Sequence, residues 1–154
     1  MTAGNSSGVT DGAAALVVAS RRAALDAGIP LQGRLVDWAV VGVAPEIMGA
    51  GPVPAIARLL QRTGLAVADI DYWEINEAFA VVNLHAEAQL GIPRERTNLY
   101  GGGISIGHPP GATGLRMTIT ALQHLADSGG RYGVISMCLG SGMGMATLVE
   151  NLQR

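Results

Sequence analysis

Two short segments in the last third of the chain place reactive side chains among glycines. Residues 107–111 are Gly-His-Pro-Pro-Gly, and residues 138–140 are Cys-Leu-Gly. An imidazole, a thiol and backbone N–H groups left open by glycine can move protons and stabilise an oxyanion at a buried acyl group. Cys138 is the only cysteine of the 154 residues. If it handles a proton, the chain has no second thiol to act as a nucleophile.

Each candidate residue also has a structural interpretation. His108 could be a histidine bonded to backbone, and Cys138 could be a small core residue. Asn76, which follows a predicted strand, could cap a helix that begins at Glu77. A helix N-terminus close to His108 would keep its imidazole neutral and able to accept a proton. At this level both interpretations of each residue remain open.

Strand and helix patterns alternate along the chain, which predicts an α/β fold with a five-stranded mixed sheet flanked by helices. The strands are predicted from apolar, β-branched runs at residues 34–42, 71–75, 97–100, 131–138 and 143–150. Helices are predicted from apolar periodicity at residues 53–63, 77–90 and 111–126. The order of elements indicates mostly parallel pairing, with an antiparallel hairpin at the end.

The first 30 residues differ from the rest. Residues 2–12 read as a loop, residues 13–19 as a short buried strand or a piece of helix, and residues 20–27 as a helix capped by Ser20. A lone strand without sheet neighbours is costly. We therefore expect residues 1–30 to be the end of a preceding domain and residues 31–154 to form a domain of their own.

In an open α/β sheet the carboxyl ends of the strands form the ligand crevice. Asn76, His108 and the turn at residues 138–140 all follow predicted strands. The sequence therefore predicts that they converge at one edge of the sheet. The glycine runs at residues 101–103 and 111–114 match neither the Walker nor the dinucleotide pattern, and tight packing of helix on sheet explains them better.

Composition excludes several functions. The net charge of −2, without a basic run, gives no argument for nucleic acid or an anionic membrane as a partner. One cysteine and no histidine pair at ligand spacing argue against a metal site, and no apolar run is long enough for a membrane span. The low cysteine count and the lack of a visible leader predict a cytoplasmic location. The 49% apolar and 14% charged content hints at a surface covered by another chain or by missing sequence.

Four motifs together resemble a known family. They are, in order, TAGNSSG at residues 2–8, NEAFA at residues 76–80, GGGISIGHPPG at residues 101–111 and CLGSGMG at residues 138–144. From end to end the chain resembles the C-terminal part of the thiolases, enzymes that make or cleave 3-ketoacyl-coenzyme A. The resemblance implies one half of the duplicated thiolase core.

The resemblance also implies roles for individual residues. His108 resembles the base that activates the nucleophilic cysteine and helps to bind the thioester oxygen. Asn76 resembles the residue that holds a water in this first oxyanion hole. Cys138 resembles the thiol that takes or returns a proton at the substrate α-carbon or the coenzyme A sulfur. The N–H of Gly140 resembles a donor of the second oxyanion hole.

The resemblance implies that coenzyme A is a substrate and that no cofactor is bound covalently. Ser7 resembles a serine that contacts the pantetheine arm, and we expect Phe79 to pack beside the site. The chain departs from the family at Ser141, where many members have glycine, and in lacking the first half, which carries the acyl-accepting cysteine.

Three hypotheses follow. The first is an incomplete thiolase that is inactive alone and needs an N-terminal half, in an oligomer. The second is a non-catalytic assembly subunit that pairs with a related chain. The third, ranked last, is a thioesterase that uses Cys138 with His108.

Overall fold

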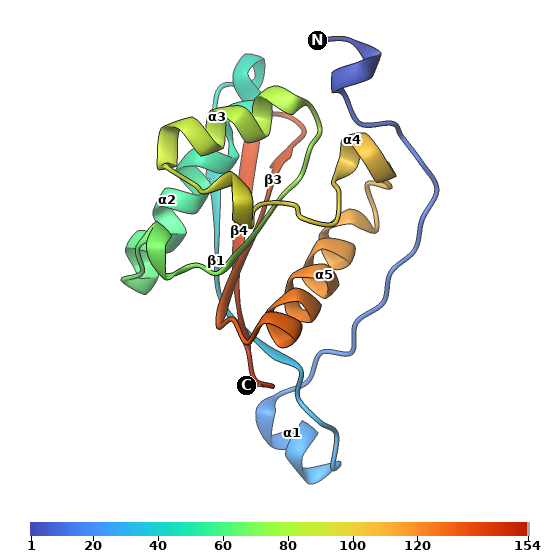
Figure 1. The fold of residues 1–154 in the computed structure, drawn as a ribbon, viewed down its shortest axis with the longest axis vertical. Helices are drawn as coiled ribbons and strands as arrows, with labels where there is room; N and C mark the ends of the chain where they lie inside the picture. The colour runs from blue at the N-terminus through green and yellow to red at the C-terminus, as the bar shows by residue number, and fades with distance from the viewer. Residues whose placement is uncertain (154) are drawn as a thin grey trace.

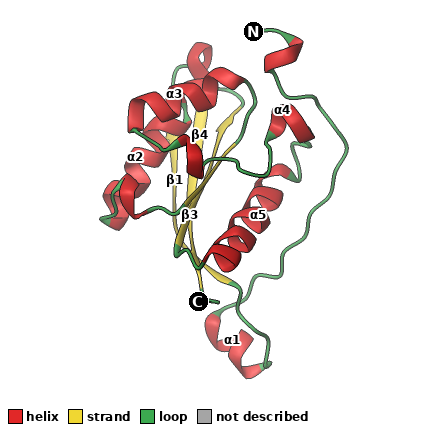
Figure 2. Cartoon of the chain, in the orientation of Figure 1, coloured by secondary structure: helices red, strands yellow, loops and turns green. Residues whose placement is uncertain are grey.

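The fold is built on a four-stranded mixed sheet with the strand order β1-β4-β3-β2 (Figures 1 and 2). The computed structural model describes residues 1–153. The strands are β1 (Gly33–Gly42), β2 (Tyr72–Ile75), β3 (Tyr132–Leu139) and β4 (Met143–Asn151). Strands β2 and β3 pair in parallel, whereas β4 pairs antiparallel with both β1 and β3. The expectation of mostly parallel pairing is therefore wrong, because the long β4 returns between β1 and β3.

Helices cover both faces of this sheet. They are α1 (Arg21–Asp26), α2 (Pro52–Thr63), α3 (Ala80–Leu90), α4 (Gly103–Ile106) and α5 (Thr113–Ser128). Short 3₁₀ turns lie at Ala3–Asn5, Pro45–Ala50, Val67–Asp69 and Arg94–Arg96. Helices α2 and α3 lie on one side of the sheet and α5 on the other, while the N-terminal segment runs outside α4 and α5 (Figure 1). Within residues 1–153 no helix is both long and apolar enough to cross a membrane.

The alternation of side chains along the strands separates two hydrophobic cores. Trp73, Ile75 and Val134 pack in the larger core, together with residues of α2 and α3. Tyr72 and Ile135 point to the other face and pack in the smaller core under α5. The sheet thus holds the carboxyl ends of β2 and β3 between two packed layers.

The predicted strand at residues 97–100 is wrong. Thr97 makes only an isolated bridge to Trp73, and the backbone of Asn98 then turns with a φ of 49°. The side-chain amide of Asn98 takes the place of a strand neighbour: its Oδ1 accepts from the N–H of Ile75 at 2.9 Å and its Nδ2 donates to the Ile75 carbonyl at 2.8 Å. A side chain therefore satisfies the free edge of β2, and the sheet has four strands rather than five.

The predicted strand at residues 13–19 is also wrong. This segment is neither strand nor helix, and Val17 and Val18 are 90% and 83% exposed. Its apolar run has no sheet edge to pair with, so the local pattern produces no ladder. The helix after it is confirmed, because the Ser20 hydroxyl accepts from the N–H of Ala23 at 3.2 Å as an N-cap.

Gly51, just before α2, lies against Gly144 in β4. A Cβ on Gly144 would overlap the backbone carbonyl of Gly51. Replacing Gly144 by Ala forces α2 and β4 apart, so we expect a loss of about 1–3 kcal/mol in the free energy of unfolding. Denaturant unfolding measures the loss. A Cβ on Gly42 meets nothing within 4 Å, so Gly42→Ala should stay within about 1 kcal/mol of the parent. Equal free energies for the two variants would contradict this contact.

Candidate active site

The N-terminal segment joins two of the sequence motifs. The N–H of Ser7 donates to the carbonyl of Ala78 at 3.0 Å, and the N–H of His108 donates to the carbonyl of Gly8 at 2.9 Å. Isolated bridges connect Ser6 with Phe79 and Val9 with His108. Residues far apart in the sequence thus meet beside the end of β2.

Asn76 follows β2 directly. Its N–H donates to the carbonyl of Ser136 in β3 at 2.9 Å, and its side chain is 2% exposed. Its Oδ1 is buried without a partner, and a Cβ on Gly103 would lie 3.3 Å from this oxygen. Helix α3 begins only at Ala80, with Phe79 as its N-cap. The helix-cap interpretation of Asn76 is therefore wrong, and the buried amide oxygen needs a donor from elsewhere.

Asn83 and Asn98, which no sequence motif singled out, hold the backbone around Asn76 in place. Asn83 and Asn98 both donate to the carbonyl of Ile75, the residue before Asn76. Asn98 also donates to Glu77, the residue after it, at 3.1 Å, and Glu77 accepts from the N–H of Ile104. An asparagine before a glycine-rich turn is the one sequence signal for Asn98, since asparagine tolerates the left-handed region.

His108 lies just before α5. Its Nδ1 lies 2.7 Å from the hydroxyl oxygen of Thr113, which is the first residue of that helix. Partial burial, and then the positive charge of Arg116, lower the pKa of His108 below its ordinary value. The ring is therefore neutral at neutral pH and can accept a proton. Thr113 had one signal in the sequence, a hydroxyl five residues after the histidine.

Cys138 lies at the carboxyl end of β3, where it pairs with Gly144. Its side chain is 8% exposed and packs in the core on the α2 and α3 side. Burial raises the pKa of the Cys138 thiol, so the thiol keeps its proton at neutral pH. Such a group suits the donation and return of a proton more than attack as a thiolate.

The three candidate residues share one end of the fold. Asn76 and Cys138 lie at the carboxyl ends of two neighbouring strands, since the N–H of Asn76 donates to the carbonyl of Ser136, two residues before Cys138 in β3. A Cβ on Gly114, in the first turn of α5, would lie 3.4 Å from the Met137 side chain. The start of α5, with His108 just before it, therefore reaches the same end of β3.

The turn from β3 to β4 has an unusual backbone. Gly140 is exposed, and a Cβ there would meet nothing within 4 Å. Ser141 has a φ of 67° and Gly142 a φ of 85°, the region that favours glycine. The residue at which the chain departs from the family pattern thus occupies a glycine-like conformation. The exposed Gly140 thus stands at the start of this turn.

Ser7 lies near Asn76, since both are close to Gly103. A Cβ on Gly103 would lie 3.2 Å from the Ser7 Cβ, and Phe79 packs partly buried against the larger core. A cavity of about 510 Å³ is lined by Glu77, Asn83, Asn98 and residues of α3 and α4. Neither His108 nor Cys138 lines it. Within residues 1–153 no three His, Cys, Asp or Glu side chains gather as a metal-binding group.

Comparison with known proteins identifies the family. The family model "Thiolase, C-terminal domain" matches residues 29–151. The peroxisomal 3-ketoacyl-CoA thiolase B of Rattus norvegicus is 54% identical over 97% of this chain and 35% of its own length. The beta-ketoadipyl-CoA thiolase of Pseudomonas knackmussii is 47% identical over 99% of this chain and 38% of its own length. The chain thus spans little more than a third of these curated relatives.

The solved structures similar to this chain also belong to thiolases and related acetyltransferases. The acetyl-CoA acetyltransferase of Bacillus anthracis superposes with a TM-score of 0.95 at 43% identity, over 98% of this chain and 38% of its own. A human mitochondrial 3-ketoacyl-CoA thiolase in complex with CoA gives the same TM-score, identity and coverage.

These relatives correct one expectation. A cytoplasmic location is wrong, because the rat and human relatives, at 54% and 51% identity, are peroxisomal proteins. The expectation failed because few cysteines indicate reducing surroundings without distinguishing one such compartment from another. Sequence motifs, family match and fold agree on the family itself: the chain belongs to the thiolases and carries their C-terminal domain.

Proposed function

We propose that this chain is the C-terminal catalytic part of a thiolase, which transfers acyl groups to or from coenzyme A. The reaction is thiolytic cleavage of a 3-ketoacyl-CoA or the reverse Claisen condensation. The proposal is supported by the placement of Asn76 directly after β2, Cys138 at the carboxyl end of β3 and His108 just before α5. Family membership supports the acyl-transfer class.

His108 and Asn76 serve the first half of the reaction. The lowered pKa of His108 keeps its ring neutral, so that it can take a proton from a nucleophilic cysteine in another part of the enzyme. The buried Oδ1 of Asn76 has no protein partner, and an enclosed water would satisfy it. That water, with His108, would donate to the thioester oxygen as charge develops on it.

Cys138 and Gly140 serve the second half. The raised pKa of Cys138 keeps the thiol protonated, so that it can give a proton to the substrate α-carbon in cleavage and take it back in condensation. The N–H of the exposed Gly140 donates to the second oxyanion. Ser7 contacts the pantetheine arm of coenzyme A, and Phe79 closes the site beside Asn76.

The missing cysteine requires a partner chain or segment. Cys138 is the only thiol in the sequence. Because the proposal assigns this thiol to the proton, we infer that a cysteine outside this chain accepts the acyl group and that the chain is inactive alone. Residues 1–30 would belong to the end of an N-terminal domain and residues 31–154 to the C-terminal domain, in line with the family match from residue 29.

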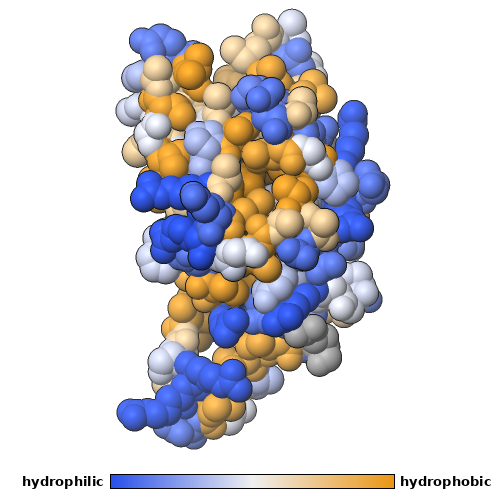
Figure 3. Space-filling model, turned by 90° about the vertical axis from the view of Figure 1, so that its left-hand side faces the viewer, coloured by the Kyte–Doolittle hydropathy of each residue, from blue (hydrophilic) through white to orange (hydrophobic). Residues whose placement is uncertain are grey.

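Exposed apolar side chains support such a partner. Trp38 and Val40 in β1 are 53% and 46% exposed, and by strand alternation they lie on the α5 side of the sheet. Leu115 and Ile119 of α5 are 38% and 40% exposed. Hydrophobic side chains also form a band on the opposite side, which carries α2 and α3 (Figure 3). Surfaces of this kind are typical of interfaces, here with an N-terminal half and with further copies in an oligomer.

Reconstitution tests the proposal. The purified chain is mixed with a thiolase N-terminal half that carries the nucleophilic cysteine, and thiolysis of acetoacetyl-CoA is followed. We expect no turnover by either chain alone and acyl transfer by the complex. A stable complex without acyl transfer would remove the catalytic proposal.

The exposed apolar surface also favours the second hypothesis, a non-catalytic assembly subunit. That function needs the interface but neither the imidazole nor the thiol. The two hypotheses therefore differ in what substitution of Cys138 does to the reconstituted complex.

A further inference from the structure

The hydroxyl of Thr113 makes two contacts. Its Oγ1 lies 2.7 Å from Nδ1 of His108 and 2.9 Å from the carbonyl oxygen of Pro109, and the residue is 1% exposed. The contact with Pro109 is the bond to the carbonyl four residues earlier that threonine commonly makes in a helix.

The proton count of these groups fixes their roles. A hydroxyl has one proton to donate, and the Pro109 carbonyl can only accept. The Thr113 hydroxyl donates to the Pro109 carbonyl, which also accepts from the N–H groups of Ala112 and Thr113. A lone pair of the hydroxyl oxygen then faces His108. Nδ1 must then carry the ring proton, which leaves Nε2 of the neutral ring with its lone pair free.

We propose that Thr113 is a positioning residue that holds His108 as the Nδ1-protonated tautomer and so reserves Nε2 as the base. Burial and Arg116 favour the neutral ring, the state in which the tautomer decides the chemistry. When Nε2 takes up a proton, the bond from Nδ1 to Thr113 becomes charge-assisted and stronger. The catalytic consequence rests on the proposed function, whereas the tautomer itself does not.

Nitrogen-15 NMR of the histidine rings in the isolated chain tests the tautomer directly. We expect a proton bonded to Nδ1 of His108 and an unprotonated Nε2. In Thr113→Val, which keeps the shape and removes the hydroxyl, the Nε2-protonated tautomer should gain population. Thr113→Ser should restore the parent tautomer.

Thr118 provides the matched control. Its hydroxyl donates to the carbonyl of Gly114 at 2.8 Å in the same helix, and Thr118→Val should leave the His108 tautomer unchanged. An Nε2-protonated ring in the parent chain overturns the proposal, even if Thr113→Val fails to fold. The proposal is also overturned if His108 keeps the parent tautomer in the Thr113→Val variant.

Kinetics of the reconstituted complex test the catalytic consequence. We expect Thr113→Val to lower kcat by about 10- to 100-fold, within the range of a positioned base, with KM for acyl-CoA close to the parent value. Thr113→Ser should recover kcat. If Thr113→Val has the same kcat as the parent complex, Thr113 does not affect catalysis through His108. If the parent complex shows no acyl transfer, the proposed function fails, while the NMR experiment still decides the tautomer.

Discussion

Cys138→Ser in the reconstituted complex is expected to lower acyl transfer by about 10²–10⁴-fold, the usual contribution of a positioned acid or base. Serine has nearly the same shape, but its hydroxyl is a far weaker acid than a thiol, so it cannot return the proton at the substrate α-carbon. Steady-state thiolysis measures the loss. Because the serine hydroxyl is buried in the apolar core, we also expect a loss of about 1–3 kcal/mol in the free energy of unfolding, so the rates are compared at a temperature at which both proteins are folded.

The neighbouring residue gives the control for this substitution. Met137 points to the opposite face and packs partly buried under α5. Met137→Leu conserves volume and should leave the acyl-transfer rate near that of the parent. Full activity in Cys138→Ser would favour the non-catalytic assembly subunit over the thiolase hypothesis.

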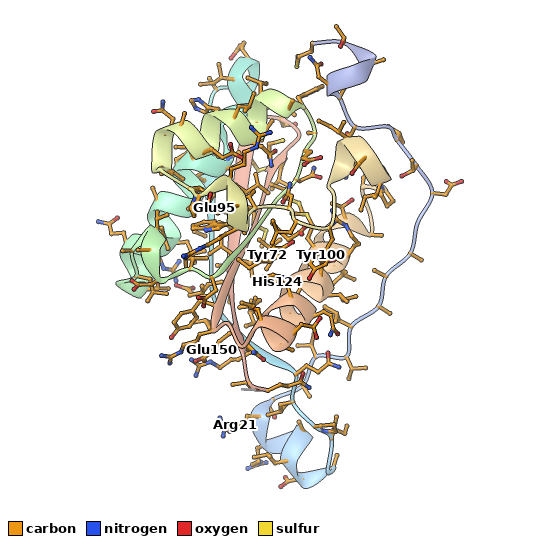
Figure 4. The ribbon with its side chains drawn as sticks, in the orientation of Figure 1. Arg21, Tyr72, Glu95, Tyr100, His124 and Glu150 are labelled. Carbon is orange, nitrogen blue, oxygen red and sulfur yellow. The ribbon has the colours of Figure 1, made fainter. Side chains whose placement is uncertain are left out.

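Arg116→Met is expected to cost about 3–5 kcal/mol of unfolding free energy, because it leaves a buried carboxylate without its cation. Glu74 in β2 is 1% exposed; its Oε2 lies 3.0 Å from Arg116 and its Oε1 accepts from the Tyr72 hydroxyl at 2.7 Å. Tyr72 in turn stacks on His124 of α5, whose ring also meets the Tyr100 hydroxyl (Figure 4). The carboxylate thus belongs to the contact that fixes α5 on the sheet.

The pH dependence of this variant has a definite sign. Burial already raises the pKa of Glu74 above its ordinary 4.5, and loss of the Arg116 charge raises it further. A raised folded-state pKa means that the stability is fully present below pH 4.5 and is lost as pH rises through the raised pKa. The deficit of Arg116→Met relative to the parent should therefore shrink in acid. Denaturant unfolding at a series of pH values measures it.

An exposed ion pair supplies the comparison. Arg62 lies 2.9 Å from Asp37, and the two side chains are 51% and 20% exposed. Arg62→Met should cost no more than about 1 kcal/mol, as is usual for pairs in contact with water. Equal losses in the two arginine variants, or an Arg116→Met deficit that does not vary with pH, would contradict the buried network.

Periodicity predicted most elements because it depends only on neighbours in the sequence. The strands β1, β2, β3 and β4 and the helices α2 and α5 lie within a few residues of their expected positions. Capping chemistry also predicted α1 from Ser20. Helix α3 begins three residues later than expected, since Asn76 to Ala78 are held by contacts with the N-terminal segment and with β3.

Elements that depend on distant partners could not be predicted in this way. Residues 97–100 have a strand-like composition, yet Asn98 pairs with β2 through its side chain and turns the backbone away. Thr113 belongs to the proposed site only because the turn after His108 folds the helix start back onto the ring. Neither contact is marked by a periodic pattern of residues in the sequence.

By itself the sequence determined which side chains are available for chemistry and in which motifs they stand: one thiol, one imidazole between glycine and proline, and one amide after a strand. It also determined the family, because four ordered motifs depend on residue identity alone. Only the tertiary structure decided that the amide oxygen of Asn76 is buried without a donor, that Thr113 faces His108, and that burial shifts the pKa of Cys138 upward. Those properties arise from groups far apart in the chain, whose contacts form only when the sheet and its helices pack together.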